Sequence, residues 1–313
     1  MRLHRMNMLR DIMLFWSWNL SRLDHRHYMN IFEGVIKIKS LLRYPGSKWR
    51  IASWILSYFP EHRSYLEPFV GSGAVFFSKQ RSDIETINDL DGDVVNLFYW
   101  VKHDPEKLAH EVYYTPYARQ IYDNAYLPDV KESNLNKAVK FLIRLNMGYG
   151  YRTTEAKVGW KNDVQGREKA YAALDWKSLP DRIIEVTERL RGVQIENRPA
   201  VDVISKFNYE NVLIYCDPPY LLNTRSGGEQ YKREMTEDDH ENLLYQLKKH
   251  KGFILLSGYE SKMYDTLLKD WHKETHINYS QVGSKKQEVL WMNFEPPAQL
   301  SIFDLATKED KAK

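Results

Sequence analysis

The chain has 313 residues, a formal net charge of +3 and one cysteine, Cys216. A single cysteine excludes an intrachain disulfide and a cysteine-based zinc site. So low a cysteine content is typical of a protein of the reducing cytoplasm. No other sequence pattern predicts a metal site. No apolar run approaches the roughly 18 residues of a membrane span, so no membrane partner is expected. With so small a net charge, any surface for nucleic acid must be local.

The first 40 residues are predicted to be an N-terminal extension of uncertain order. An apolar run at residues 12–20 follows basic residues, as in a signal peptide, but Asp11 borders it and no small-residue cleavage site follows. Translation starting at Met29 is an alternative, since the first motif comes soon after it.

That motif is Arg43-Tyr44-Pro45-Gly46-Ser47-Lys48. Ser47 is expected to cap a helix over residues 49–59, and Gly46 permits a close approach of the backbone. Free N–H groups at the helix start, with Lys48, suit a carboxylate or phosphate, although a capped surface helix without a ligand explains the same residues.

A strand at residues 65–70, a glycine turn and a helix at residues 74–80 form the first unit of a nucleotide-type fold. Phe76 stands where the dinucleotide fingerprint has its third glycine, which argues against NAD. Glu67 places a carboxylate at the strand end, and a negative charge there favours a cationic or amine-bearing ligand.

The next predicted strand, residues 84–88, ends at Asp89. An acid at this place commonly accepts hydrogen bonds from ribose hydroxyls, and capping of the helix predicted at residues 94–102 is an equal alternative. For Asp91 and Asp93, capping is the favoured interpretation.

Residues 105–192 interrupt the alternation of strands and helices. Helices are predicted at residues 137–145 and 181–191, and the segment between them mixes aromatic rings with cations. That mixture suits phosphate contacts with base stacking or wedging, and a solvated helical insertion is the alternative. The candidate DNA contacts here are Tyr149, Arg152, Lys157 and Lys161.

The alternation then resumes, which predicts an α/β fold with a mainly parallel sheet covered on both faces. Strands are expected at residues 193–196, 212–216 and 252–256, helices at 201–206, 236–250 and 261–270, and an antiparallel pair at 276–282 and 288–294. Thr236 and Asp239 are predicted to form a capping box.

The strand at residues 212–216 ends at Asp217-Pro218-Pro219-Tyr220. Its continuous apolar run suits burial on both faces, and the prolines cannot donate to the ladder. A carboxylate and a ring are therefore left at the carboxyl edge, where open α/β sheets bind ligands. Cys216 is expected to be a small buried hydrophobe and not a nucleophile.

The motif order resembles that of Dam-type (D12 class) DNA adenine-N6 methyltransferases, especially those of phages and mobile elements. The resemblance spans residues 41–297 and rests on the motifs at 43–48, 67–73, 88–91 and 215–220. It implies a class I S-adenosylmethionine-dependent methyltransferase fold, a Rossmann-like sheet with an antiparallel last strand. Residues 41–104 and 193–297 would form the catalytic domain, residues 105–192 a mostly helical target-recognition insertion, and residues 298–313 a flexible tail.

The resemblance also assigns the site of the cofactor, S-adenosylmethionine. Gly46 and Lys48 would hold its methionine end, and Asp89 its ribose hydroxyls. The remaining residues of this site would be Tyr44, Glu67, Phe69, Gly71, Gly73 and Asp217. Pro199 stands where the family usually has an aspartate near the cofactor's adenine, which implies the loss of one polar contact.

The catalytic residues implied are Asp217, Pro218, Pro219 and Tyr220. The lone pair of adenine N6 is delocalised into the ring, so two acceptors are needed to bind the amino hydrogens and turn the lone pair out of the plane. The Asp217 carboxylate and the Pro218 carbonyl supply them, and the prolines stiffen the geometry. Tyr220 would stack on an adenine flipped out of double-stranded DNA.

Arg225 and Tyr231, in the loop beyond this motif, are further candidate DNA contacts, and an ordinary surface loop is the alternative. Cytosine-N4 methylation uses the same geometry, but those enzymes more often carry serine at the position of Asp217. A catalytically silent DNA-binding homologue is the alternative from another class. The segment Gln299–Phe303 resembles the short peptide with which bacterial proteins bind the polymerase sliding clamp.

Overall fold

A computed structural model describes residues 38–296 of the chain, except 129, 163, 165–171, 226–227 and 280–284. All the elements below belong to the unit Lys39–Lys313. Residues 1–37 of the predicted extension, the predicted tail and the clamp-like segment Gln299–Phe303 lie outside the described residues. Over the part of the chain that is described, no helix combines the length and the apolar character that a membrane crossing requires.

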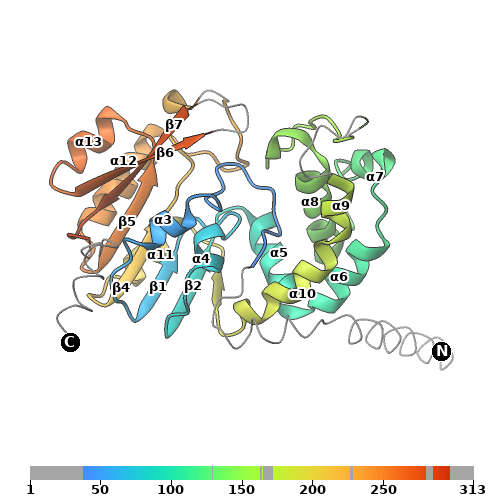
Figure 1. The fold of residues 1–313 in the computed structure, drawn as a ribbon, viewed down its shortest axis with the longest axis horizontal. Helices are drawn as coiled ribbons and strands as arrows, with labels where there is room; N and C mark the ends of the chain where they lie inside the picture. The colour runs from blue at the N-terminus through green and yellow to red at the C-terminus, as the bar shows by residue number, and fades with distance from the viewer. Residues whose placement is uncertain are drawn as a thin grey trace, which may run out of the picture. The chain divides into compact units, whose positions relative to one another are not determined.

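The described residues form a seven-stranded sheet in the order β3-β2-β1-β4-β5-β7-β6 (Figure 1). Neighbouring strands from β3 to β5 run parallel, and β7 is antiparallel to both β5 and β6. This confirms the mainly parallel sheet that the sequence predicts. The strands are β1 (Ser64–Glu67), β2 (Ile84–Asn88), β3 (Gln194–Glu196), β4 (Val212–Cys216), β5 (Phe253–Gly258), β6 (His272–Tyr279) and β7 (Lys285–Met292).

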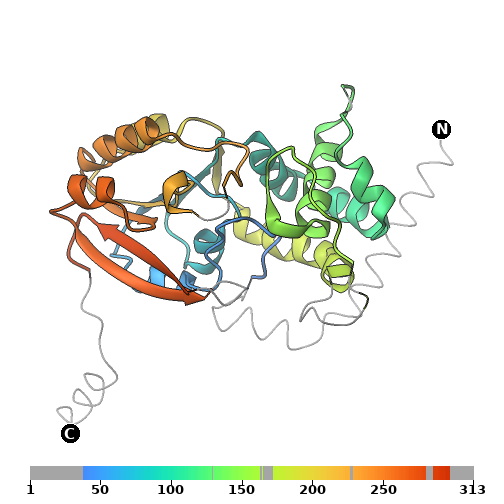
Figure 2. The ribbon, with the colours of Figure 1, turned by 90° about the horizontal axis from the view of Figure 1, so that it is seen from above.

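Helices cover both faces of the sheet, as Figure 2 shows from above. On one face Leu66, Ile214 and Leu256 pack with helix residues such as Leu244 and Tyr264 in a fully buried cluster. On the other face the ring of Phe59 lies against Tyr65 and Tyr215. The flanking helices are α3 (Ala52–Leu56), α4 (Ala74–Ser78), α5 (Gly92–His103), α11 (Ala200–Lys206), α12 (Glu237–Lys248) and α13 (Lys262–Leu267).

The N-terminus of α12 has the cap predicted from the sequence, whereas the N-terminus of α3 does not. Thr236 and Asp239 form the predicted capping box at the start of α12. The prediction that Ser47 caps a helix is wrong, because α3 begins at Ala52 and has no side-chain cap. Ser47 instead shares a hydrogen bond with Ser72, which ties the first motif to the glycine turn.

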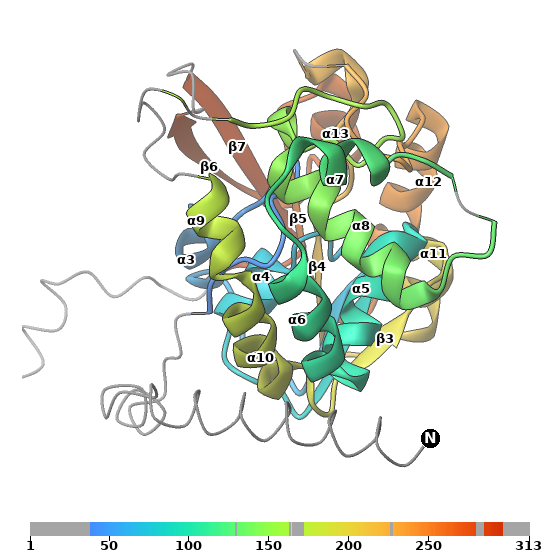
Figure 3. The ribbon, with the colours of Figure 1, turned by 90° about the vertical axis from the view of Figure 1, so that its right-hand side faces the viewer.

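The described part of residues 105–192 consists of helices joined by loops, with one isolated bridge between Gly148 and Trp160 (Figure 3). Arg189 of the last of these helices donates to Glu85 of β2, which also pairs with Lys79. This buried cluster fastens the returning end of the insertion to the sheet. The elements are α6 (Pro105–Tyr114), α7 (Arg119–Asn124), α8 (Asn134–Met147), η1 (Tyr149–Tyr151), α9 (Ala172–Lys177) and α10 (Leu179–Leu190).

Candidate active site

The Asp217-to-Tyr220 motif lies where the strand order of the sheet reverses. Strand β1 pairs with β2 on one side and β4 on the other, so Glu67, the last residue of β1, and Asp217, which follows β4, lie at the carboxyl ends of adjacent strands. At such a switch point in an open α/β sheet, the connections that follow the two adjacent strands leave toward opposite faces of the sheet. The crevice between these two connections binds ligands. All five residues of β4 are buried, including Cys216, so the predicted buried strand is confirmed.

Asp217 receives two hydrogen-bond donors on one oxygen. The hydroxyl of Ser257 donates to Oδ1 over 2.7 Å, and Nζ of Lys48 lies 3.0 Å from the same atom. The side chain of Asp217 is 19% exposed, so one side of this carboxylate faces the cleft. Because a carboxylate has about four acceptor sites, Asp217 can accept a further donor from a ligand.

Lys48 joins the first motif to the catalytic motif. Its side chain is 4% exposed, and Nζ donates to the carbonyl of Gly46 over 2.6 Å while pairing with Asp217. Burial by itself would lower the pKa of Lys48, but the carboxylates of Asp217 and Glu288 outweigh it and raise the pKa. Lys48 therefore keeps its positive charge inside the site.

Tyr220 is held on three sides. Its hydroxyl donates to Oε2 of Glu288 over 2.8 Å, the ring of Tyr259 meets it edge-on at 4.6 Å between centroids, and Nζ of Lys48 lies 4.7 Å from its centroid. Glu288 is not among the site residues predicted from the sequence. The available signal was one acidic residue at the start of the apolar run at residues 289–292.

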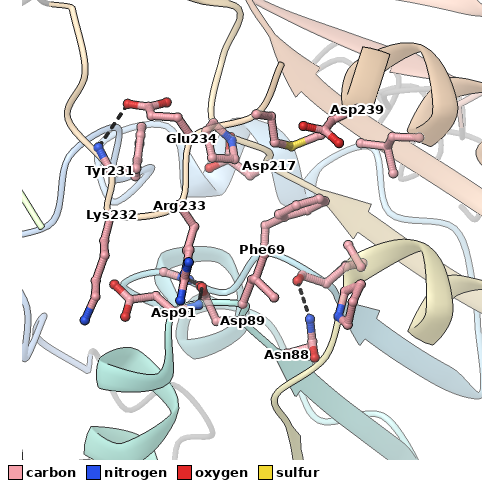
Figure 4. A pocket seen from close by; sticks show the side chains of 18 of the residues that line it. Phe69, Asn88, Asp89, Asp91, Asp217, Tyr231, Lys232, Arg233, Glu234 and Asp239 are labelled. Carbon is pink, nitrogen blue, oxygen red and sulfur yellow. Dashed lines mark hydrogen bonds between the residues drawn. The ribbon is translucent and has the colours of Figure 1, made fainter. Parts of the chain in front are cut away.

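Two adjoining pockets open at this edge of the sheet, and the larger has a volume of about 190 Å³ (Figure 4). The smaller one reaches Gly46, Lys48 and Glu67. Residues shared by both linings make them one continuous cleft, and these are Tyr44, Phe69, Gly71, Asp217 and Tyr231. The cleft thus brings most of the predicted cofactor residues together with the catalytic motif.

Gly71 is required by both its backbone and its surroundings. Its φ of +46° lies in the left-handed region, and a Cβ added there would come within 2.8 Å of the Tyr44 ring. The turn is fastened by Asp89, whose Oδ2 accepts from the N–H of Gly71 over 2.9 Å. The glycine that the sequence places in the turn after β1 is therefore explained by the close contact between Gly71 and the Tyr44 ring.

The three acids after β2 have separate roles. Asp89 lines the larger pocket, and its Oδ1 also accepts from the N–H of Asp91, while burial raises its pKa to about 7. Asp91 caps α5, as predicted. The capping prediction for Asp93 is wrong, because its carboxylate pairs with Arg144 and Lys232.

Glu67 is buried at the end of β1, and burial raises its pKa to about 8. Its Oε2 accepts from the hydroxyl of Tyr65 over 2.7 Å. The carboxyl group is therefore largely protonated at neutral pH unless a cation binds beside it.

Pro199 lines the larger pocket as the N-cap residue of α11. Its ring offers neither a donor nor an acceptor, so this stretch of wall is apolar where the resemblance implies an acid.

A segment between η2 (Leu222–Thr224) and α12, residues 228–236, lines the larger pocket through residues 231–235, and we call it the strap. Glu234 organises it by accepting from the backbone N–H groups of Gln230 and Tyr231 and by a bidentate pair with Arg225. Arg233 points from the strap into the pocket toward Asp89 and Asp91 (Figure 4).

The six predicted DNA contacts divide into two groups. Tyr149, Arg152 and Lys157 are exposed on the insertion. Lys161 as a whole residue is 6% exposed and the Arg225 side chain is 7% exposed, since they are turned to Tyr151 and Glu234 respectively.

Tyr231 lines the cleft, and its hydroxyl donates to the carbonyl of Pro45. Lys161, Arg225 and Tyr231 therefore have contacts within the chain and are less accessible to DNA than the first group, and their role as DNA contacts stays a prediction.

The chain is similar in sequence to known DNA methyltransferases. Residues 44–282 match the family model of the D12 class N6 adenine-specific DNA methyltransferases. A DNA adenine methylase of Vibrio cholerae serotype O1 is 25% identical over 207 residues, which cover 62% of this chain and 70% of the relative. The type II methyltransferase M1.LlaDCHI of Lactococcus lactis is 24% identical over 294 residues, which cover 85% and 99%.

A DNA N-6-adenine-methyltransferase of Escherichia phage P1 is 25% identical over 211 residues, which cover 63% of this chain and 26% of the phage protein. The family match begins at Tyr44, within the first motif, and includes the glycine turn, Asp217 and Tyr220; all residues that line the two pockets also lie within it. The chain belongs to the D12 class of N6 adenine-specific DNA methyltransferases.

Proposed function

We propose that the cleft binds S-adenosylmethionine and that Asp217, Pro218, Pro219 and Tyr220 present a flipped adenine of double-stranded DNA to it. The observation that carries the proposal is the meeting of Lys48, Asp217 and Tyr220 at one end of a cleft that continues to Asp89 and Asp91. A methyl donor and an acceptor base must lie side by side, and this cleft offers adjacent space for both.

The residues of the cleft fit this cofactor in two respects. Asp91 lines the larger pocket, and among the described residues its buried Oδ2 has no hydrogen-bond partner, so it is an acceptor left over for a ribose hydroxyl. The buried carboxyl of Glu67 and the Lys48 amine lie in the smaller pocket and suit a ligand that carries charges of both signs. When bound, S-adenosylmethionine supplies an electrophilic methyl group and a neutral leaving group.

Asp217 and the Pro218 carbonyl act on the base. They accept hydrogen bonds from the two amino hydrogens of N6, which turns its lone pair toward the incoming methyl carbon. Lys48 and Ser257 both donate to the Asp217 carboxylate and hold it in place beside the cleft. Tyr220 stacks on the flipped base and offsets part of the cost of removing it from the duplex.

Tyr149, Arg152 and Lys157 give the insertion an exposed group of one ring and two cations that can contact phosphates. The proposal therefore places DNA across the insertion and the carboxyl edge of β4.

Incubation of the protein with unmethylated DNA and cofactor labelled in its methyl group, followed by digestion to nucleosides, tests the proposal. Label is expected in N6-methyldeoxyadenosine. Label in N4-methylcytosine, or none in DNA, would overturn it. Sequencing that detects modified bases in DNA from cells expressing the protein then gives the target site.

A further inference from the structure

Glu288 is a buried carboxylate beside the catalytic motif, contributed by the antiparallel strand β7. Because β7 runs against β5, its first half lies at the carboxyl edge of the parallel strands, with Leu290 opposite Ser257. Val289 and Trp291 face the core under α12 and α13, so Glu288 faces the other side of the sheet, where Asp217 lies. Its residue exposure is 7%.

The position of Glu288 bears on the orientation of the Tyr220 ring. A tyrosine ring that only packs against neighbours can rotate about its side-chain torsions, whereas one whose hydroxyl is also bonded is fixed at both ends. The Tyr220 hydroxyl donates to Glu288 over 2.8 Å, and Tyr259 and Lys48 contact the ring itself. The carboxylate of Glu288 is thus the contact that holds the far end of the ring.

We propose that Glu288 is a positioning residue for methyl transfer, which holds Tyr220 as a fixed platform for the target base. This inference rests on the proposed stacking role of Tyr220. If the ring shifts, the base stacked on it shifts as well, and its amine leaves the acceptors of Asp217 and Pro218. Displacements of about 1 Å at a reacting group can reduce rates by up to roughly 10²-fold.

Four variants test the proposal: Glu288→Ala, Glu288→Gln, Tyr220→Phe and the double variant Glu288→Ala/Tyr220→Phe. Glu288→Ala should lower kcat about tenfold and leave the dissociation constant of S-adenosylmethionine within about twofold. Glu288→Gln keeps an oxygen acceptor for the hydroxyl and should recover most of kcat. Because both single changes remove one hydrogen bond, the double variant should be no slower than the slower single variant.

The matched control is Gln287→Ala, since Gln287 is the exposed neighbour on the same strand. Multiplying effects in the double variant, or a Glu288→Ala enzyme as fast as the control, would overturn the proposal. A loss of cofactor affinity and thermal stability in Glu288→Ala that matches its loss of rate would assign Glu288 a purely structural role, which also overturns it.

The assay of the wild-type protein shows whether a negative result concerns the proposed function or only the role of Glu288. If the wild type deposits no N6-methyladenine, the proposed function fails whatever the variants do. If it does and Glu288→Ala is unimpaired, only the role of Glu288 fails.

Discussion

The side chain of Thr153 is hydrogen-bonded to the backbone of Lys232, whose N–H donates to Thr153 Oγ1 over 2.9 Å. The N–H of Thr153 in turn donates to the carbonyl of Gln230. Thr153 belongs to the insertion, whereas Gln230 and Lys232 belong to the strap. The predicted DNA-binding segment is thus joined directly to a wall of the larger pocket, which Lys232 lines.

Thr153→Val should loosen the strap, because valine keeps the shape of threonine and removes its hydroxyl. A lost hydrogen bond to a backbone N–H is worth about 1 kcal/mol, so the dissociation constant of S-adenosylmethionine should rise roughly fivefold. Isothermal titration of purified variants measures it. Thr154→Val is the matched control, since the buried Thr154 hydroxyl has no hydrogen-bond partner among the described residues. Equal affinities of the two variants for S-adenosylmethionine would contradict the idea that the Thr153 hydroxyl holds the strap in place.

Asp217→Ala should lower the rate of methyl transfer by at least about 10²-fold, because it removes one of two acceptors aimed at the amine. Cofactor binding should weaken far less, since the walls formed by Tyr44, Gly71 and Asp89 stay in place. Single-turnover transfer and equilibrium binding of the cofactor distinguish the two effects. Retained transfer in this variant would refute the catalytic role of Asp217.

Arg189→Met should destabilise the fold by about 3 kcal/mol, because it leaves the buried Glu85 carboxylate with one cationic partner instead of two. The nearby pair of Arg191 and Glu188 has side chains 73% and 70% exposed, so Arg191→Met should cost less than about 1 kcal/mol. Urea unfolding of both variants gives the comparison. Similar losses in the two would show that the buried cluster does not anchor the insertion.

The free energy of unfolding should depend on pH through the titration of Glu67. Its pKa rises from 4.5 in the unfolded chain to about 8 in the fold, chiefly through burial. Between these values the folded state holds a proton that the unfolded state has released, so this contribution to stability is lost as the pH rises from about 4.5 to about 8.

Glu67→Gln, which is neutral at every pH, should therefore gain stability relative to wild type across that window. Thermal unfolding at several pH values checks this, with Glu61→Gln at an exposed position as the control. A constant difference between Glu67→Gln and wild type from pH 5 to pH 8 would contradict it.

The sequence alone determined the elements that depend on neighbours along the chain. The apolar run of β4 stopped by Pro218 and Pro219, the capping box at Thr236 and the alternation of strands with helices are local signals, and they indicate the parallel sheet and the edge where ligands bind. Local signals also led to the wrong cap at Ser47, because they cannot anticipate a hydroxyl partner from the glycine turn.

Only the tertiary structure decided which charges meet. The pairing of Lys48 with Asp217 spans 169 positions of the chain, and the bond from Tyr220 to Glu288 spans 68. Nothing in the spacing of these residues encodes the contact, because it arises from the strand order and from the reversed direction of β7. For the same reason the sequence suggests surface positions for Arg225 and Tyr231, whereas in the fold Arg225 pairs with Glu234 of the strap and Tyr231 lines the cleft.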